Sequence, residues 1–249
     1  MPKFFVNEEQ IKENHIQIVG SDVNHIKNVL RQKIGNQITI CNEAMEQDYI
    51  CEIEKIEEKS IECKIIEKLK SDVESNVKVT IFQGLPKADK MELVIQKSVE
   101  LGVYNIIPVE MKRCVVKLNE KDKIKKRQRW QKISEVAAKQ SGRSIIPKIE
   151  NIISIKNVCN MCDEYDILLL AYENERENTL KQELNKIKEL EKKEIKIGII
   201  IGPEGGIDEK EVKELNETGA KVITLGKRIL RTETVALNVL SIIMYELEN

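Results

Sequence analysis

The sequence predicts an α/β fold in which a helix-covered parallel sheet follows a smaller β domain. Between residues 36 and 66, apolar and polar residues alternate with a period of two, which is typical of half-buried strands. From residue 77 onward, apolar runs alternate with amphipathic helical patterns, which favours a parallel sheet covered on both faces. The polar stretch 71–76 separates the two patterns. We therefore expect one domain at residues 1–72 and another at residues 73–249.

The first domain is expected to contain several short strands. They lie at Ile38–Ile40, Tyr49–Ile53 and Ile61–Ile66, with candidate turns at 35–36 and 57–60. Short strands at this spacing predict a small β-barrel or sandwich.

The second domain is expected to alternate strands with helices. The strands are residues 77–82, 105–109, 166–171, 195–201 and 221–225. Helices are expected between Asp89 and Gly102, at about 121–141 and 178–193, after Asp208, and at the end of the chain. Asp89 with Glu92, and Asp208 with Glu211, have the spacing of a capping box.

Composition excludes several classes of protein. With 41% hydrophobic residues and a net charge of −1, the chain is globular and not disordered. It shows neither a signal-like start nor an apolar run approaching the roughly 20 residues of a membrane span, so we expect a soluble, cytoplasmic protein. Among six cysteines, only Cys159 and Cys162 form a C-x-x-C pair, and the two histidines lie far away in sequence. We therefore expect reduced thiols and no metal.

Ligands of open parallel sheets bind at the carboxyl ends of the strands, where three loops are expected. These loops are residues 172–174, 202–206 and 226–233. Gly202, Gly205 and Gly206 would let the backbone approach a ligand closely. The loop lacks the lysine and hydroxyl of a P-loop, which argues against a nucleotide hydrolase. A tight connection without a ligand is the alternative interpretation.

The loop 226–233 is predicted to form a second part of the same pocket. Its backbone amides, with Leu225 and Leu230, suit a flat apolar ring with polar edges such as adenine. Arg231 and Glu233 could then face a substrate. The alternative is surface charge with a local ion pair.

Basic residues gather in one part of the chain. Residues 112–148 contain 13 basic and 3 acidic residues, a net charge of +10 in a chain whose total is −1. Such a stretch indicates a polyanion binder, and the alternative is a solvated helix face. Residues 1–72 have a net charge of −4, so RNA contacts there require a local patch. The candidates are Lys27, Arg31 and Lys33, with His25.

A set of motifs resembles one known family. The motifs are 25–31 (HIKNVLR), 84–87 (GLPK), 96–102 (QKSVELG), 113–117 (RCVVK), 140–143 (QSGR), 201–206 (IGPEGG) and 225–234 (LGKRILRTET). In this order they are similar to the RsmE family of 16S ribosomal RNA methyltransferases, over nearly the whole chain. The last two motifs are the most specific.

The resemblance implies a SPOUT-type α/β domain with a C-terminal trefoil knot, preceded by a PUA-like β-barrel that binds RNA. It also implies a homodimer, and methylation of N3 of a uridine in 16S ribosomal RNA of the small subunit, with S-adenosylmethionine as donor. A ribose 2′-O-methyltransferase of the same fold and a non-catalytic ribosome-assembly factor are the alternatives. No metal or membrane is expected to take part.

Candidate site residues follow from the loops and the resemblance together. Donor-binding candidates are Leu170, Tyr172, Glu173, Ile201, Gly202, Glu204, Gly205, Gly206, Leu225, Gly226, Arg228 and Leu230. For catalysis we expect Arg231 to stabilise negative charge on the uridine oxygens and Glu233 to accept its proton. For RNA contacts, to phosphates above all, we expect His25, Arg31, Arg113 and Arg143.

Overall fold

The computed structural model describes residues 3–45, 47–70, 73–190 and 192–248. The chain divides into two compact units. One comprises Met1–Glu74 with Ala138–Ile146, and the other comprises Ser75–Ala137 with Pro147–Asn249. The expected domain boundary at residue 72 lies outside the described residues. Within the part of the chain that is described, no helix has the length and apolar character needed to cross a membrane.

The first unit is built on a six-stranded mixed sheet. Its strand order is β1 (Lys3–Phe5), β4 (Gln37–Asn42), β5 (Gln47–Ile56), β6 (Ser60–Lys70), β3 (His15–Val19) and β2 (Ile11–Lys12). β1 runs parallel to β4, and all other pairs are antiparallel. β4, β5 and β6 are the strands expected from the alternation. The short β1, β2 and β3 were not expected, nor were the 3₁₀ turn Glu8–Gln10, helix α1 (Ser21–Asn24) and the π-helical turn His25–Val29.

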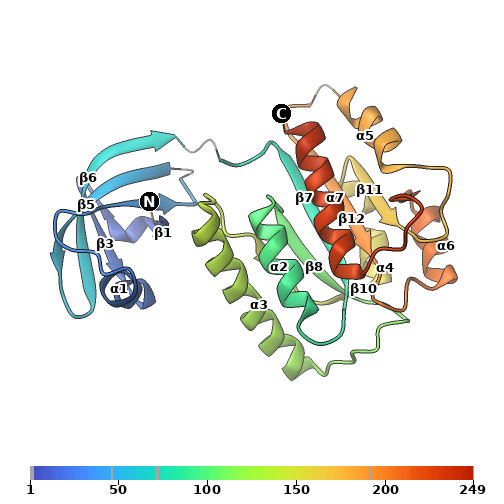
Figure 1. The fold of residues 1–249 in the computed structure, drawn as a ribbon, viewed down its shortest axis with the longest axis horizontal. Helices are drawn as coiled ribbons and strands as arrows, with labels where there is room; N and C mark the ends of the chain where they lie inside the picture. Colours follow the sequence, from blue (N-terminus) through green and yellow to red (C-terminus); the bar gives the residue numbers. More distant parts are fainter. Residues whose placement is uncertain (1–2, 46, 71–72, 191, 249) are drawn as a thin grey trace. The chain divides into compact units, whose positions relative to one another are not determined.

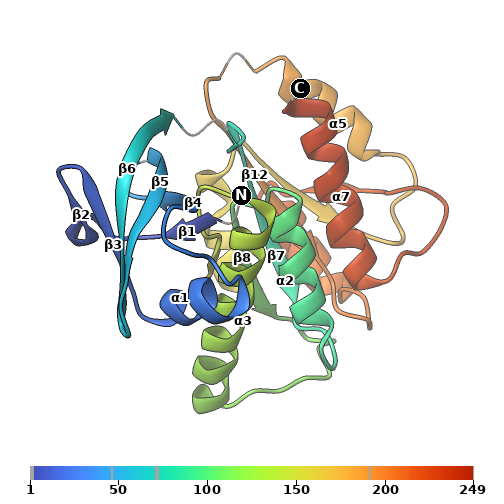
Figure 2. The ribbon, with the colours of Figure 1, turned by 60° about the vertical axis from the view of Figure 1, so that its left-hand side comes forward.

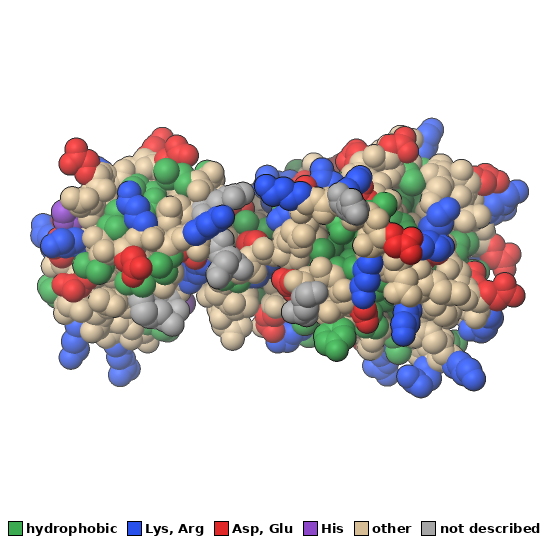
Figure 3. All heavy atoms as spheres, turned by 90° about the horizontal axis from the view of Figure 1, so that it is seen from above, with side chains coloured by type: hydrophobic (Ala, Val, Ile, Leu, Met, Phe, Trp, Pro, Cys, Tyr) green, Lys and Arg blue, Asp and Glu red, His purple; other side chains and the backbone are tan. Residues whose placement is uncertain are grey.

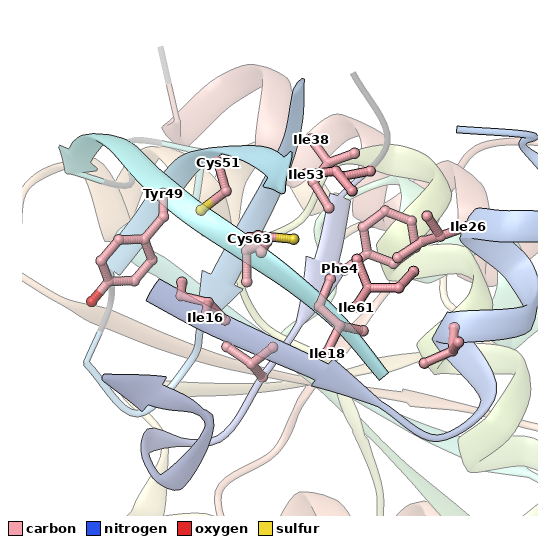
Figure 4. Packing of buried hydrophobic residues seen from close by; sticks show 13 residues of the cluster. Phe4, Ile16, Ile18, Ile26, Ile38, Tyr49, Cys51, Ile53, Ile61 and Cys63 are labelled. Carbon is pink, nitrogen blue, oxygen red and sulfur yellow. The ribbon is translucent and has the colours of Figure 1, made fainter. Parts of the chain in front are cut away.

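The core of this unit confirms the period-two pattern (Figure 4). Alternate residues of β4, β5 and β6 point inward, and their side chains are fully buried. They pack with residues from β1, β3 and α1 and the turn after it. The cluster contains Phe4, Val6, Ile16, Ile18, Val23, Ile26, Ile38, Ile40, Tyr49, Cys51, Ile53, Ile61 and Cys63.

A segment from much later in the chain also belongs to this unit. Helix α3 (Glu120–Ser141) extends into it, and the residues after the helix are held by buried polar groups. Lys3 pairs with Asp48 at 2.7 Å and donates to the Ser144 hydroxyl at 2.7 Å. Arg143 pairs with Glu74 at 2.6 Å. Burying such charges requires paired partners, and the sequence pattern showed none of these long-range pairs.

The second unit contains the expected parallel sheet. Its order is β10 (Ile153–Ser154), β8 (Asn105–Glu110), β7 (Val77–Gly84), β12 (Ile195–Ile201), β11 (Ile167–Ala171) and β13 (Lys221–Ile223), and β9 (Lys148–Ile149) also pairs with β8. Every pair is parallel. The run Ile197–Ile201 is buried because β12 lies between β7 and β11.

Helices cover this sheet. Figures 1 and 2 show α2 (Lys90–Glu100) and α7 (Thr232–Leu247) side by side, and α7 packs on the central strands β7 and β12. α4 (Ile155–Asn160) contacts α6 (Glu209–Glu217), and α5 (Leu180–Lys188) contacts α7. On α3, Trp130 is buried.

Some expected bounds were wrong. The helix expected at 178–193 ends at Lys188, and the strand expected at 221–225 ends at Ile223. The Asp208–Glu211 capping box is formed, whereas the Asp89 side chain caps nothing. The C-terminal knot stays a prediction of the family resemblance.

Candidate active site

Three neighbouring strands of the second unit end at the same level. Ala171, the last residue of β11, pairs with Ile201 of β12 and with Ile223 of β13. The loops that follow these strands therefore start at one edge of the sheet. Together with the start of α2 and α7 they enclose a cavity of about 470 Å³.

This cavity brings together most of the residues expected from the sequence. Those that line it are Tyr172, Glu173, Ile201, Gly202, Glu204, Gly205, Gly206, Leu225, Gly226, Arg228, Leu230 and Arg231. Leu170 is fully buried in β11, and neither Leu170 nor Glu233 is among the lining residues.

Sequence reasoning missed other lining residues. They are Lys90, Ala171, Arg176, Pro203, Ile207, Thr224, Ile229, Thr232 and Val235. Most of them are direct neighbours of expected residues. Lys90 is different, because it begins the helix after β7 and no local pattern connects it with these loops.

The glycine loop is packed too closely for side chains. A Cβ atom on Gly202 would lie 2.7 Å from Cγ1 of Ile207. Gly206 has a φ of +69°, and a Cβ atom there would lie 2.5 Å from Oε1 of Glu173. The Gly206 N–H donates to the Pro203 carbonyl at 2.9 Å and closes the turn. The expected close approach of bare backbone to the cavity is therefore present.

Thr232 connects the glycine loop with α7. Its hydroxyl donates to the Gly202 carbonyl at 2.7 Å and accepts from the Gln83 side-chain amide at 2.9 Å. Gln83 lies on β7, and both side chains are buried. Three segments that are distant in sequence meet at this hydroxyl.

Lys90 makes a second connection on the same side of the cavity. Its ammonium lies 3.1 Å from Oε1 of Glu204 and 3.3 Å from Oε2 of Glu233. The Glu204 carboxylate, chiefly, and that of Glu233 raise the pKa of Lys90. Burial acts to raise the pKa of Glu204, but backbone N–H donors, including Lys87, and the Lys90 ammonium lower it overall. Lys90 and Glu204 are therefore both charged at neutral pH.

The expected RNA-contacting residues divide between the two units. His25 and Arg31 are exposed on the first unit, where the His25 ring makes an edge contact with Phe4. Arg113 is exposed on the second unit, and its guanidinium donates to the Gly205 carbonyl at 3.3 Å, beside the glycine loop.

The prediction that Arg143 contacts phosphate is wrong. The side chain expected to contact phosphate is only 5% exposed, and Glu74 accepts hydrogen bonds from its guanidinium at 2.6 and 3.0 Å. A long cation in a basic stretch resembles a phosphate ligand in sequence, but here it is held by a buried carboxylate. In the structure it holds the residues that follow α3 to Glu74 of the same unit.

No group of three or more His, Cys, Asp or Glu side chains is placed to hold a metal ion in the described ranges. Cys159 and Cys162 are partly buried, and burial is the main cause that raises the pKa of each thiol.

Comparison with known proteins shows the class of protein to which this fold belongs. A family model for an RNA methyltransferase domain matches residues 73–244, and one for an RNA methyltransferase PUA domain matches residues 18–66. The chain is therefore an RNA methyltransferase with an N-terminal PUA domain.

Full-length relatives narrow the class. The chain is 37% identical to the ribosomal RNA small subunit methyltransferase E of Bacillus subtilis (strain 168), covering 100% of this chain and 98% of that protein. It is 36% identical to the protein of the same name from Mesomycoplasma hyopneumoniae (strain 232), covering 97% and 98%. The chain belongs to the ribosomal RNA small subunit methyltransferase E family.

Solved structures agree with this assignment. A ribosomal RNA small subunit methyltransferase E from Neisseria gonorrhoeae, bound to S-adenosyl methionine, is 31% identical with a TM-score of 0.84, covering 98% of this chain and 97% of that one. A putative methyltransferase from Legionella pneumophila, in complex with the same cofactor, is 28% identical with a TM-score of 0.85, covering 98% and 96%.

Proposed function

We propose that this protein transfers a methyl group from S-adenosylmethionine to N3 of a specific uridine in 16S ribosomal RNA of the small subunit. The observation that carries the proposal is the cavity at the carboxyl edge of β11, β12 and β13, which is lined by every expected donor-binding residue except Leu170. We further propose that the protein acts in the cytoplasm as a homodimer.

The residues of the cavity fit this donor. Gly202, where a Cβ atom would meet Ile207, and Gly206, which has a positive φ, both line the cavity. Leu225 and Leu230 supply apolar contacts of the kind that an adenine ring requires. The bound donor supplies a methyl group already activated by its sulfonium, so the protein must mainly hold and orient the two reactants.

Methylation of uridine requires a group that accepts the N3 proton and a group that stabilises the negative charge left on the base. N3 of uridine carries a proton at neutral pH, and its loss spreads negative charge over O2 and O4. Arg231 lines the cavity and is exposed, without an ion-pair partner in the described part of the chain. A preorganised donor of this kind stabilises such charge by about 3 kcal/mol. Glu233, in the first turn of α7, is the proposed proton acceptor.

RNA binding is proposed to involve Arg113 and the exposed face of α3. On the face that Figure 3 shows, basic and acidic side chains are interspersed. Lys117, Lys121 and Lys125 are exposed and have no acidic partner among the described residues. Lys121 and Lys125 are four residues apart and so lie on one face of the helix. On the PUA domain we propose His25 and Arg31.

The donor pocket is tested by calorimetry with S-adenosylmethionine. A Cβ atom on Gly205 would lie 3.0 Å from the Arg113 carbonyl oxygen, so a Gly205→Trp variant should block the loop. We expect saturable binding by the wild type and none by this variant. Lys210→Trp, equally bulky but on exposed α6, should bind like the wild type. A wild type that binds no donor would favour the assembly-factor alternative.

The modified atom is tested by mass spectrometry of nucleosides after digestion of treated 16S RNA. We expect N3-methyluridine. A ribose 2′-O-methyl nucleoside would instead support the alternative enzyme of the same fold.

The phosphate contacts are tested through salt dependence. Replacing Lys121 and Lys125 together by glutamine should reduce the slope of log affinity against log salt by about 1.5. Lys132→Gln is the matched control, because Lys132 on the same helix is already paired with Glu135 at 2.7 Å. Equal slopes in all three proteins would exclude this face of α3 from the interface.

A further inference from the structure

Lys90 lies where three parts of the site meet. It is the first residue of α2, and its side chain lines the cavity. One of its carboxylate partners, Glu204, belongs to the glycine loop after β12, and the other, Glu233, belongs to the first turn of α7. Neither donor binding by the glycine loop nor the expected catalytic roles of Arg231 and Glu233 require a cation between Glu204 and Glu233.

The two carboxylates depend on Lys90 to different degrees. Glu204 also accepts hydrogen bonds from the backbone N–H of Lys87, at 3.0 and 3.3 Å. Glu233 is only 14% exposed, and within the described residues its Oε2 has no aligned hydrogen-bond donor. Its ion-pair partner in the same part of the chain is Lys90. Loss of the Lys90 ammonium would therefore leave Glu204 with its hydrogen bonds from the Lys87 backbone, whereas Glu233 would lose its ion-pair partner.

An untied carboxylate at this depth would not keep its place. Glu233 is partly buried, and a carboxylate that loses its cation there would turn toward solvent or shift the start of the helix. Arg231, two residues before Glu233, faces the cavity. The ion pair thus determines how the acceptor-side segment Arg231–Glu233 lies against the donor loop.

We propose that Lys90 is a positioning residue for methyl transfer, whose ammonium holds the Arg231–Glu233 segment against the glycine loop. The inference rests on the proposed function. Transfer requires donor carbon and acceptor nitrogen in line, and a displacement of about 1 Å lowers rates by about 100-fold. Lys90 therefore acts on the rate more than on donor affinity, because Glu204 keeps its backbone donors when the ammonium is removed.

The test compares Lys90→Met, Glu233→Gln, the double variant and the wild type. Single-turnover methylation of small-subunit RNA is measured at saturating donor and RNA, and donor affinity is measured by calorimetry. For Lys90→Met we expect a rate about 10- to 100-fold lower, with donor affinity changed by less than about threefold. The double variant should be no slower than Glu233→Gln, because each single substitution already removes the same ion pair between Lys90 and Glu233. Lys90→Arg should recover most of the rate.

Lys97→Met is the matched control, since Lys97 is on the same helix but pairs with Glu100 away from the cavity. A wild-type rate in Lys90→Met, or rate losses that multiply in the double variant, would overturn the inference. If Lys90→Met does not fold, Lys90→Gln takes its place in the same comparison.

A separate readout distinguishes the inference from the proposed function. A wild type that binds donor but transfers no methyl group would refute the proposed function. Thermal unfolding midpoints of the same four proteins then test, without any activity, the connection between Lys90 and Glu233 on which the inference depends. Shifts that are smaller in the double variant than their sum support the connection between Lys90 and Glu233, and additive shifts overturn it.

Discussion

The hydroxyl of Thr232 donates a 2.7 Å hydrogen bond to the carbonyl oxygen of Gly202. Thr232 is the first residue of α7, and Gly202 is the first residue after β12. One buried hydroxyl therefore joins the last helix of the chain to the glycine loop. The position of this loop depends on a residue 30 positions later in the sequence.

Thr232→Val tests this connection with almost no change in shape. The Gly202 carbonyl would lose this donor, and Gln83 would keep only its hydrogen bond to the Gly84 carbonyl. An unmet buried polar group costs about 1–3 kcal/mol, so we expect the free energy of unfolding to fall by about 2 kcal/mol and donor binding to weaken. Urea unfolding and calorimetry measure the two effects. Thr234→Val, exposed in the same turn, should change neither.

Gly206→Ala tests the packing of the glycine loop. The new methyl group would displace the Glu173 carboxylate, which lines the cavity, and the residue would keep a positive φ, so we expect donor affinity to fall. Gly219→Ala is the control, because Gly219 also has a positive φ of +105° but lies outside the cavity. Both variants place an alanine at positive φ, a backbone strain of about 1–3 kcal/mol. Equal losses of donor affinity in the two variants would assign the effect to strain, and wild-type affinity in Gly206→Ala would contradict the prediction.

Arg231→Gln tests the proposed stabilisation of charge on the uridine. We expect the single-turnover rate to fall by about 100-fold while donor affinity stays close to that of the wild type. Arg231→Lys keeps the charge without the planar guanidinium and should lie between the two. Quenched-flow methylation assays measure the rates. A loss confined to donor affinity would instead assign Arg231 to the donor site.

Glu74→Gln tests the buried pair with Arg143 through its dependence on pH. Burial acts to raise the pKa of Glu74, but Arg143 and the backbone N–H groups of Ser144 and Ile145 lower it overall. A carboxyl with a lowered pKa in the folded state stabilises the fold above its unfolded pKa of about 4.3, and this contribution is lost as pH falls through the folded pKa. The wild type should therefore exceed Glu74→Gln in stability at pH 7, by a margin that shrinks on acidification.

Urea unfolding between pH 7 and pH 3 measures this margin. Glu57→Gln is the control, because the pKa of Glu57 is also lowered, mainly by its hydrogen bond from Lys55, but the pair is exposed. A constant margin for Glu74→Gln across this range would contradict the prediction. Arg143→Gln should be destabilised as well, without a change in the salt dependence of RNA binding.

Local sequence patterns were sufficient to predict many of the strands and most of the loops that form the cavity. The alternation at Ile38, Ile40, Ile53 and Ile61 predicted buried strands because side chains of a strand point to opposite faces in turn. The glycine and LGKRILRTET motifs predicted most of the cavity lining, because loops at the carboxyl ends of neighbouring parallel strands necessarily meet. The very short strands β1, β2 and β3 were beyond such reasoning, since two to five residues carry too little periodicity.

The sequence by itself therefore determined the class of fold, the order of most strands and helices and the loops that form the cavity, because each depends on residues close together in the chain. Only the tertiary structure decided the partners of long polar side chains. Arg143 is buried against Glu74, Lys90 lies between Glu204 and Glu233, and Thr232 is bound to Gly202. These pairs join positions far apart in sequence, and a charged residue in a sequence shows its charge but not the group that it meets after folding.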